Sequence, residues 1–534
     1  MGTLGRSTTS RAQSAARRRS AARRVRGSLL LTVLCLLSFA PPTSATDPPT
    51  GERSSEEAAP SGEVAEETWP RLSLFLPLSM ERAAPRPSAA RTELSWLTDL
   101  GDFDSGRTTP LRGGGPLPFP LPSGIEPDGR IPRGEIPADI HHPERWRYIP
   151  EGLIPQGGIF DRFLSTTFIT PILSFEEDVG TGGGIQFTDI DLFDSRRQML
   201  GSAALSYTTE GQQLYQLTFR RFHHQRELEE GGILQEERSW SGLSGGYQRT
   251  LTRRFYGLGA ESRLEDESSY SEELWSFWLG EQRAIPHPGD EWVVNYGVAF
   301  ERRNLGSGHV VGVPDTGAVA PGLFEAAAAI DSIWLTTGVR FDTRDGQHLP
   351  YRGGTLGLEV EWSPWADREM EGAHLSLSGS QVIPVPPLFH DGGSPEEEHP
   401  PIDTFAMGFR LDDTSGDLPF WSRPTLGGSH TLRGYAPDRF TDNSALHLVG
   451  EYRFWVLPRG FEVVAGSRVE RFGLALFGEA GTVASRLGDL PDAELHSNVG
   501  VGLRMTFERL ALLRIDVGFS DEGANLSVDF GLSF

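Results

Sequence analysis

One stretch of the chain combines residue types that could hold a long loop in a fixed place. Residues 425–435 read Thr-Leu-Gly-Gly-Ser-His-Thr-Leu-Arg-Gly-Tyr, with three glycines, one arginine and one tyrosine. Glycine allows sharp backbone turns that a side chain would forbid. A buried guanidinium needs polar or charged partners. The chemistry expected of this stretch is therefore ion pairing by Arg433, rather than covalent catalysis.

Two runs typical of β-strands flank this stretch, at residues 404–411 and 445–455. A connection of about thirty residues is far longer than a hairpin turn and indicates either function or disorder. We predict that this loop enters the interior of a membrane barrel and that Arg433 is held there. The alternative is a solvated arginine on an exposed loop.

Alternation of apolar and polar residues dominates the chain from about residue 166 to its end. In the last run, one face carries Leu526, Val528, Phe530, Leu532 and Phe534, and the other carries Ser527, Asp529, Gly531 and Ser533. A soluble β-sandwich also alternates, but here the polar face holds charges and glycines in run after run, as the lumen of a barrel allows. The fold class expected is all-β, a transmembrane antiparallel β-barrel of about sixteen strands, with a disordered N-terminal region. The runs are 168–176, 182–190, 197–208, 212–222, 238–250, 268–283, 291–304, 331–342, 353–364, 371–382, 402–413, 443–457, 471–482, 496–507, 510–520 and 524–534.

The segments before the barrel suit export. Residues 1–45 hold eight arginines, then an apolar run around residues 29–37 and a small-residue cleavage site, which together predict a signal peptide. A membrane anchor is the alternative, but the apolar run is short of the ~20 residues that span a bilayer. Residues 46–150 carry 17 of the 38 prolines and predict a largely disordered periplasmic linker. The barrel is then expected over residues 151–534.

Charge and cysteine content exclude several classes of function. The net charge of −24 disfavours nucleic-acid binding. The single cysteine, Cys35, lies in the leader, so neither a disulfide framework nor a thiolate metal site is expected. Adjacent histidines, as in His141-His142, cannot easily share one ion, and no Gly-rich loop runs from a strand into a helix. We therefore expect no metal and no cofactor.

The loop and a later strand together resemble a known family. Residues 427–435 are similar to the Val/Leu-Arg-Gly-Phe/Tyr signature of the bacterial surface antigen barrel, found in the barrel-assembly and translocation-assembly factors of the outer membrane. Residues 477–481, Phe-Gly-Glu-Ala-Gly, resemble that family's Phe-x-Asp-x-Gly, with glutamate in place of the usual aspartate. The resemblance implies a luminal loop motif and an acid partner motif. These are Gly427, Gly428, Leu432, Arg433, Gly434 and Tyr435, and Phe477, Glu479 and Gly481.

The same resemblance implies a function. The barrel is expected in the bacterial outer membrane, where it would insert or translocate proteins or lipids through a weak seam between its first and last strands. Pro171 lacks the N–H of a sheet ladder and would weaken that seam, unless it merely lies at a strand end. Expected partners are outer-membrane lipid, unfolded outer-membrane proteins as clients, and the assembly machinery that would read Phe530, Leu532 and Phe534 as a terminal insertion signal. The alternative is a passive channel or a structural surface barrel without client handling.

Other chemistry has weaker support. Glu451, Arg453, Arg504, Arg514 and Asp516 share the inward parity, so they either extend the Arg433 pair into a network or simply line a wet lumen. His374 and Ser376 lie two apart on one strand, a spacing that places both on one face, as a nucleophile and its base require. They face inward with no orienting acid evident nearby, and we expect that the protein is not an enzyme.

Overall fold

The computed structural model describes residues 126, 130–133, 135–154, 166–176, 178–367, 370–394, 396–464, 467–507 and 511–534. All of these belong to the compact unit Trp69–Phe534. The predicted signal peptide and most of the predicted linker lie outside the described residues. So do the side chains of residues 168–177, 462–468, 507, 511 and 530.

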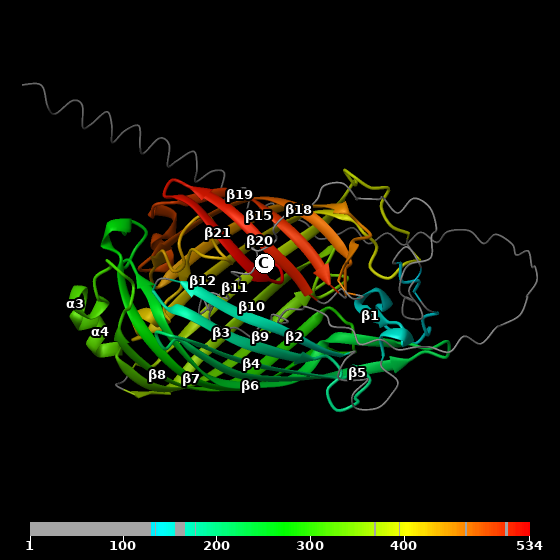
Figure 1. Ribbon diagram of the computed structural model, residues 1–534, viewed down its shortest axis with the longest axis horizontal. Coiled ribbons are helices and arrows are strands. Elements are labelled where there is room, and N and C mark those ends of the chain that lie inside the picture. The colour runs from blue at the N-terminus through cyan, green and yellow to red at the C-terminus, as the bar shows by residue number, and fades with distance from the viewer. Residues whose placement is uncertain are drawn as a thin grey trace, which may run out of the picture. The chain divides into compact units, whose positions relative to one another are not determined.

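The described residues of this unit form sixteen long antiparallel strands, which confirms the predicted all-β barrel and its number of strands (Figure 1). Each predicted run overlaps one of them. They are β2 (Thr167–Glu176), β3 (Gly180–Asp189), β4 (Met199–Thr208), β5 (Gln213–Glu227), β6 (Ile233–Phe255), β7 (Ser268–Ile285), β8 (Trp292–Ser307), β9 (Ala329–Asp342), β10 (Gly353–Ala366), β11 (Gly372–Val385), β12 (Asp403–Gly416), β15 (Ser444–Leu457), β18 (Arg471–Ala484), β19 (His496–Phe507), β20 (Ala511–Ser520) and β21 (Gly523–Phe530).

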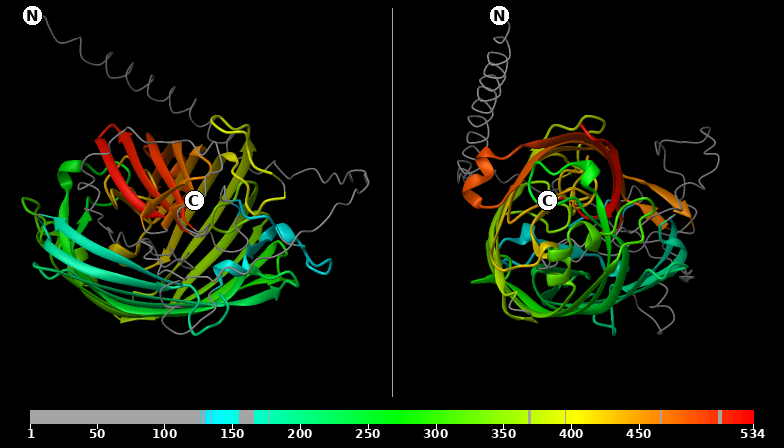
Figure 2. Two further views of the ribbon diagram at one scale, coloured as in Figure 1. Left: turned by 45° about the vertical axis from the view of Figure 1, so that its right-hand side comes forward. Right: turned by 90° about the vertical axis from the view of Figure 1, so that its left-hand side faces the viewer.

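The pairing follows the order of the chain. Each long strand pairs antiparallel with the next, from β2 and β3 through to β20 and β21, with β12 pairing β15 and β15 pairing β18 across the intervening loops. In the right-hand view of Figure 2 these strands surround an interior. The sheet is therefore a meander curled into a barrel, in which each long strand pairs with its neighbours in sequence.

The two faces of the strands differ as the alternation predicts. Leu526, Val499 and Phe519 are 66%, 64% and 49% exposed, whereas the inward Asn498 and Asp516 are buried. In water such exposed apolar residues would be costly, but an apolar outer face suits a barrel surrounded by lipid. The charged residues thus face the interior, where they can find partners.

Two strands were longer than the sequence pattern indicated. The β5–β6 hairpin extends well past the predicted ends at residues 222 and 238, so the supposed long connection 223–237 is mostly strand. A short strand, β1 (Trp146–Ile149), pairs with the start of β6. It is preceded by the 3-10 turn η2 (Pro143–Arg145) and followed by η3 (Glu151–Leu153). The boundary predicted at residue 150 therefore falls inside a segment that packs on the barrel.

The last strand ends earlier than predicted. β21 stops at Phe530, and Gly531 has φ +86°, a left-handed conformation that breaks the strand. The Phe534 ring packs against the inward-facing Gly408: a Cβ added to Gly408 would lie 2.5 Å from the ring. The guanidinium carbon of Arg453 lies 5.2 Å from the centroid of the same ring. Phe534 is thus inside the barrel, which corrects the prediction that it continues the outward face of the last strand.

Shorter elements occupy the connections. The connection between β8 and β9 holds α3 (Thr316–Val319) and α4 (Pro321–Ala327), at the opposite end of the strands from β1 (Figure 1). The remaining short elements are η4 (Leu264–Asp266), η6 (Phe420–Ser422), β13 (Thr425–Leu426), β14 (Phe440–Thr441), β16 (Phe461–Val464), β17 (Ser467–Val469) and η7 (Leu487–Asp492). Among the described residues, no helix combines the length and the apolar character needed to cross a membrane.

Candidate functional site

The connection between β12 and β15, residues 417–443, folds back on itself as a compact hairpin. We call it the inner loop. Leu426 of β13 pairs with Phe440 of β14, so the two ends of the hairpin run side by side. Gly427 and Gly428 follow β13 with φ of +116° and +104°. At Gly427 an added Cβ would lie 2.2 Å from the carbonyl oxygen of Ala436. This position therefore requires glycine for both conformation and space.

The tip of the inner loop touches a strand backbone directly. A Cβ added to Gly518 of β20 would lie 2.5 Å from the nitrogen of Gly434 and 2.6 Å from the carbonyl carbon of Arg433. A Cβ added to Gly434 would in turn meet the Cβ of Asn498 at 2.7 Å. Two glycines that face each other thus let the loop lie against the barrel wall, and this contact places Arg433 deep in the interior.

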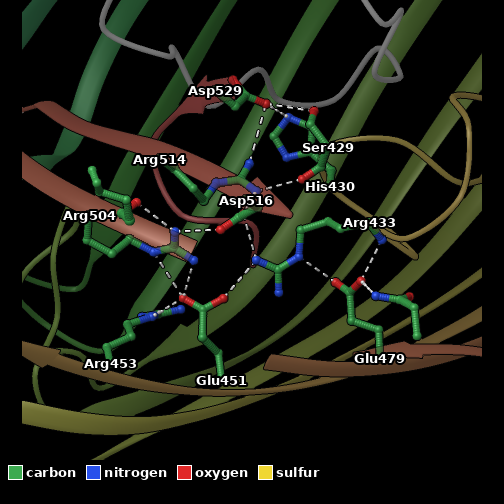
Figure 3. A network of polar contacts seen from close by, with 12 residues as sticks. Ser429, His430, Arg433, Glu451, Arg453, Glu479, Arg504, Arg514, Asp516 and Asp529 are labelled. Carbon is green, nitrogen blue, oxygen red and sulfur yellow. Dashed lines mark hydrogen bonds and ion pairs between the residues drawn. The ribbon is translucent and has the colours of Figure 1, made fainter. Parts of the chain in front are cut away.

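Arg433 is fully buried and bonded to three carboxylates (Figure 3). Its Nε donates to Oε1 of Glu479 at 2.9 Å, and its backbone N–H donates to Oε2 of the same residue at 2.6 Å. Its Nη1 donates to Glu451 and to Asp516, both at 2.9 Å. The guanidinium carbon also lies 3.5 Å from the ring centroid of Phe477. One cation therefore joins β15, β18 and β20 through a single loop residue.

The contacts of Arg433 continue into a wider network. Glu451 also accepts bonds from Arg453 and Arg504, and Asp516 from Arg504 and Arg514. Arg514 reaches Asp529 of β21 at 3.4 Å and the carbonyl oxygen of Ser429 at 2.7 Å. The chain has no lysine, so each of these cations is a guanidinium, whose planar fork suits bonding to several carboxylates at once. The named arginines and carboxylates balance: Arg433, Arg453, Arg504 and Arg514 against Glu451, Glu479, Asp516 and Asp529.

The other residues of the predicted motifs lie around this centre. Tyr435 donates to Asp521 at 2.7 Å, beyond the end of β20. Burial, together with that carboxylate, raises the pKa of Tyr435 above its ordinary value, so the phenol keeps its proton. Leu432 is fully buried, and its N–H points to Nε2 of His447 at 3.4 Å. Gly481 leaves room for Leu426, whose Cδ1 would lie 2.9 Å from an added Cβ.

Several members of the site were not expected from the sequence. Arg439 of the inner loop bonds Glu522 at 2.7–2.9 Å and Ser262 at 2.8–3.0 Å, and so ties the loop to two other connections. Asn498 donates to Glu479, and His430 and Ser429 both reach Asp529 at 2.8 Å. Asn498 and Asp529 have the inward parity that identified the other charges. Arg439 carried no such sign, since it lies outside the alternating strands.

The structure also shows the surroundings of the His374–Ser376 pair and of the adjacent histidines. The hydroxyl of Ser376 donates to Oδ1 of Asp412, and the nitrogen of Arg410 lies 3.4 Å from the same hydroxyl. The ring of His374 packs 5.4 Å from that of Trp334. Ser376 is thus bonded to a carboxylate and an arginine of the neighbouring strand, so an acid that the sequence did not reveal, Asp412, lies beside this pair. His141 and His142 do meet ligand-type residues of another segment, although the sequence gave no sign of this.

Comparison with known proteins identifies the family of the C-terminal part of the barrel, residues 290–534. The match is to the Omp85 superfamily domain, over residues 290–534. These residues are an Omp85 superfamily domain. The matched range holds β8 to β21, the inner loop and the whole Arg433 network, so the family predicted from the loop and acid motifs is confirmed there. The β2–β7 part of the sheet precedes the Omp85 match and continues the same meander.

Three matches among solved structures have low sequence identity to this chain. BamA from Haemophilus ducreyi lacking POTRA domains 1–3 is 13% identical with a TM-score of 0.42, over 69% of this chain and 70% of that one. CdiB from Acinetobacter baumannii is 12% identical (TM-score 0.41, 68% and 59% covered), and CdiB from Escherichia coli is 11% identical (TM-score 0.43, 68% and 61% covered). A comparison with curated proteins found no match. The Omp85 domain assigns the barrel to the bacterial outer membrane.

Proposed function

We propose that this Omp85 barrel inserts or translocates polypeptides at the outer membrane, by opening between its first and last strands while the inner loop braces the last ones. The observation that carries this proposal is the Arg433 network. It joins the inner loop to β15, β18, β19, β20 and β21, the strands next to one side of the seam. The activity would be mechanical, with no covalent step, no metal and no cofactor in the translocation itself.

The bracing role follows from where the network ends. Its last member is Asp529 of β21, held by Ser429 and His430 of the inner loop. Beyond β21, the pairings within the described residues do not include a ladder from β21 to β2. A strand that lacks a neighbour on one side needs another support, and contacts with the inner loop would supply it. Pro171 of β2 cannot donate a hydrogen bond, which further favours a weak seam.

The clients would be unfolded outer-membrane proteins, and the surrounding lipid would be the second partner. An unpaired strand edge presents N–H and C=O groups that can pair with an incoming strand. The barrel itself would reach the membrane through the assembly machinery, which would read the C-terminal residues Phe530, Leu532 and Phe534. The side chain of Phe530 lies outside the described part of the structure.

A seam cross-link tests the proposal. The only cysteine of the chain is Cys35, in the predicted leader, so an introduced pair, one cysteine in β2 and one in β21, would be free of competing thiols. Cells that depend on the oxidised variant should accumulate unfolded outer-membrane proteins, and a reductant should reverse this. A control pair between β8 and β9, which are already paired, should have no effect. Normal assembly of other barrels with the seam locked would overturn the proposal.

A passive channel or structural barrel is the second candidate. Depleting the protein while monitoring the folding of other outer-membrane proteins separates the candidates. A channel would change permeability alone, whereas an insertion factor would change the abundance of its clients.

A further inference from the structure

A group of metal-ligand side chains lies at the end of the barrel that carries β1. His141 comes from the segment before β1, while His287 and Asp290 come from the connection between β7 and β8. One nitrogen of each imidazole and one carboxylate oxygen all lie within 4.8 Å of one another. This group is far along the chain from the inner loop, and the proposed translocation does not use it.

The distances suit a single ion. Nδ1 of His287 is 3.1 Å from Oδ2 of Asp290, and Nδ1 of His141 is 3.7 Å from Oδ1 of the same carboxylate. Donor atoms about 2.0–2.1 Å from a tetrahedral zinc ion lie roughly 3.3 Å apart, which these two separations bracket. The two rings, with centroids 4.6 Å apart, therefore already flank one carboxylate at close to ligand spacing.

The backbone around these side chains is fixed in advance. Trp146 of β1, only 7% exposed, donates its Nε1 hydrogen to the carbonyl oxygen of His141 at 3.2 Å. Gly289 has φ +87°, and a Cβ added there would lie 2.9 Å from that same oxygen. Glycine thus lets the β7–β8 connection approach the segment before β1. The N–H of Asp290 donates to the carbonyl of His287 at 3.1 Å, which closes the turn that presents both ligands.

Neighbouring charges make His141, His287 and Asp290 a better metal site than the overlapping group of His142, Asp290 and Glu291. His142 and Glu291 lie near Asp290 as well, but Glu291 is paired with Arg145 at 2.9 Å. Asp290 has a side chain that is 13% exposed and faces the two imidazoles. His141 and His287 are 55% and 58% exposed, so an ion from solvent can reach them.

We propose that His141, His287 and Asp290 bind one divalent transition-metal ion, with zinc as the best-suited ion. Two imidazoles and one carboxylate favour zinc or a similar metal over magnesium or calcium, which prefer oxygen ligands. Three protein ligands leave a fourth position for water. The ion would join the segment before β1 to the β7–β8 connection and hold β1 in its pairing with β6.

Zinc titration of tag-free full-length protein in detergent, after removal of metal with a chelator, tests this site. Calorimetry should show one zinc ion per chain. His287→Ala and Asp290→Asn should each weaken binding at least ~10-fold, since the first removes a ligand and the second replaces an anionic carboxylate with a weaker neutral amide. Magnesium should not compete. His309→Ala, which removes an exposed histidine from the β8–β9 connection, is the matched control and should bind as the wild type. Heat-dependent gel mobility checks that each variant is folded.

Cleavage by trypsin gives a second readout, which reports the accessibility of the backbone rather than the heat of binding. Zinc should slow cleavage after Arg133 in the wild type and in His309→Ala, but not in His287→Ala. No saturable binding, or equal binding by the wild type, His287→Ala and Asp290→Asn, would overturn the proposal. Loss of binding in His309→Ala to the same extent as in His287→Ala would also overturn it, because the ion would then be bound elsewhere.

Discussion

At the scale of residues, the buried charges around Arg433 stabilise one another as ion pairs. Arg433 is surrounded by three carboxylates, and each of these is shared with another donor. Breaking a buried ion pair by removing one partner costs about 3–5 kcal/mol, because the other charge remains in a poor environment. Removal of the Arg433 side chain should cost more stability than removal of any one of its acids, because Glu451, Glu479 and Asp516 all lose a partner at once.

Replacement of Arg433 by lysine should not restore the site. An ammonium has no planar fork and cannot follow the two directions from Nε to Glu479 and from Nη1 to Glu451 and Asp516. We expect Arg433→Lys to lose at least half of the unfolding free energy that Arg433→Ala loses. Urea unfolding monitored by tryptophan fluorescence measures this. Arg263→Lys, at an exposed pair with Asp266, is the control and should leave stability unchanged.

The contact between the inner loop and β20 predicts a second effect. In Gly518→Ala the added methyl would strike the backbone of Arg433 and Gly434, neither of which can rotate away. We expect a loss of about 1–3 kcal/mol in unfolding free energy, as for other overpacked sites. Gly478→Ala is the control, because its nearest neighbours would be 3.9 Å away. Equal stability of the two variants would mean that the inner loop does not press on β20.

At the scale of elements, strand positions followed from alternation, whereas ends and contacts between distant elements did not. Leu526 and Val499 were placed outward by period two alone, and the inward set of five charges emerged in the same way. The early end of β21 depends on the left-handed backbone of Gly531, which glycine permits but does not require. The meeting of His141 with Asp290 depends on how β1 docks, and no local pattern specifies that.

The connection between β9 and β10 predicts a pH effect. Burial raises the pKa of Asp345 to about 6, although the N–H of Tyr351 donates to its carboxylate. The folded state therefore holds its proton more tightly than the unfolded state, whose pKa is near the ordinary 3.8. Stability must then fall as pH rises from about 4 to about 6, by on the order of 3 kcal/mol.

Asp345→Asn should remove this part of the pH dependence. Midpoints of urea unfolding at pH 4.5 and pH 7.5 would measure it, with the variant less sensitive to pH than the wild type. Asp391→Asn, an exposed carboxylate in the β11–β12 connection, provides the control with the same change of charge. A variant at residue 345 whose pH profile equals that of this control would contradict the assignment.

At the scale of the whole barrel, we expect the inner loop to limit ion conduction through the interior. Arg433 and Arg439 anchor it at two points, on the inner wall and on the other connections. We expect low conductance of the wild type in planar bilayers, and a larger, fluctuating conductance when both arginines are replaced by alanine. Arg263→Ala should behave as the wild type. A steady, large conductance in the wild type that the double variant leaves unchanged would favour the passive channel.

The most direct measurement of the central claim is a double-mutant cycle between Arg433 and Glu479, read as free energy of unfolding. The cycle needs the wild type, Arg433→Ala, Glu479→Ala and the double variant, each in the same micelles. If the inner loop is pinned by this pair, the double variant should be no less stable than the worse single variant, with a coupling energy of about 2 kcal/mol or more. Additive losses, with coupling within about 0.5 kcal/mol of zero, would show that the two residues act independently and would contradict the pinned loop.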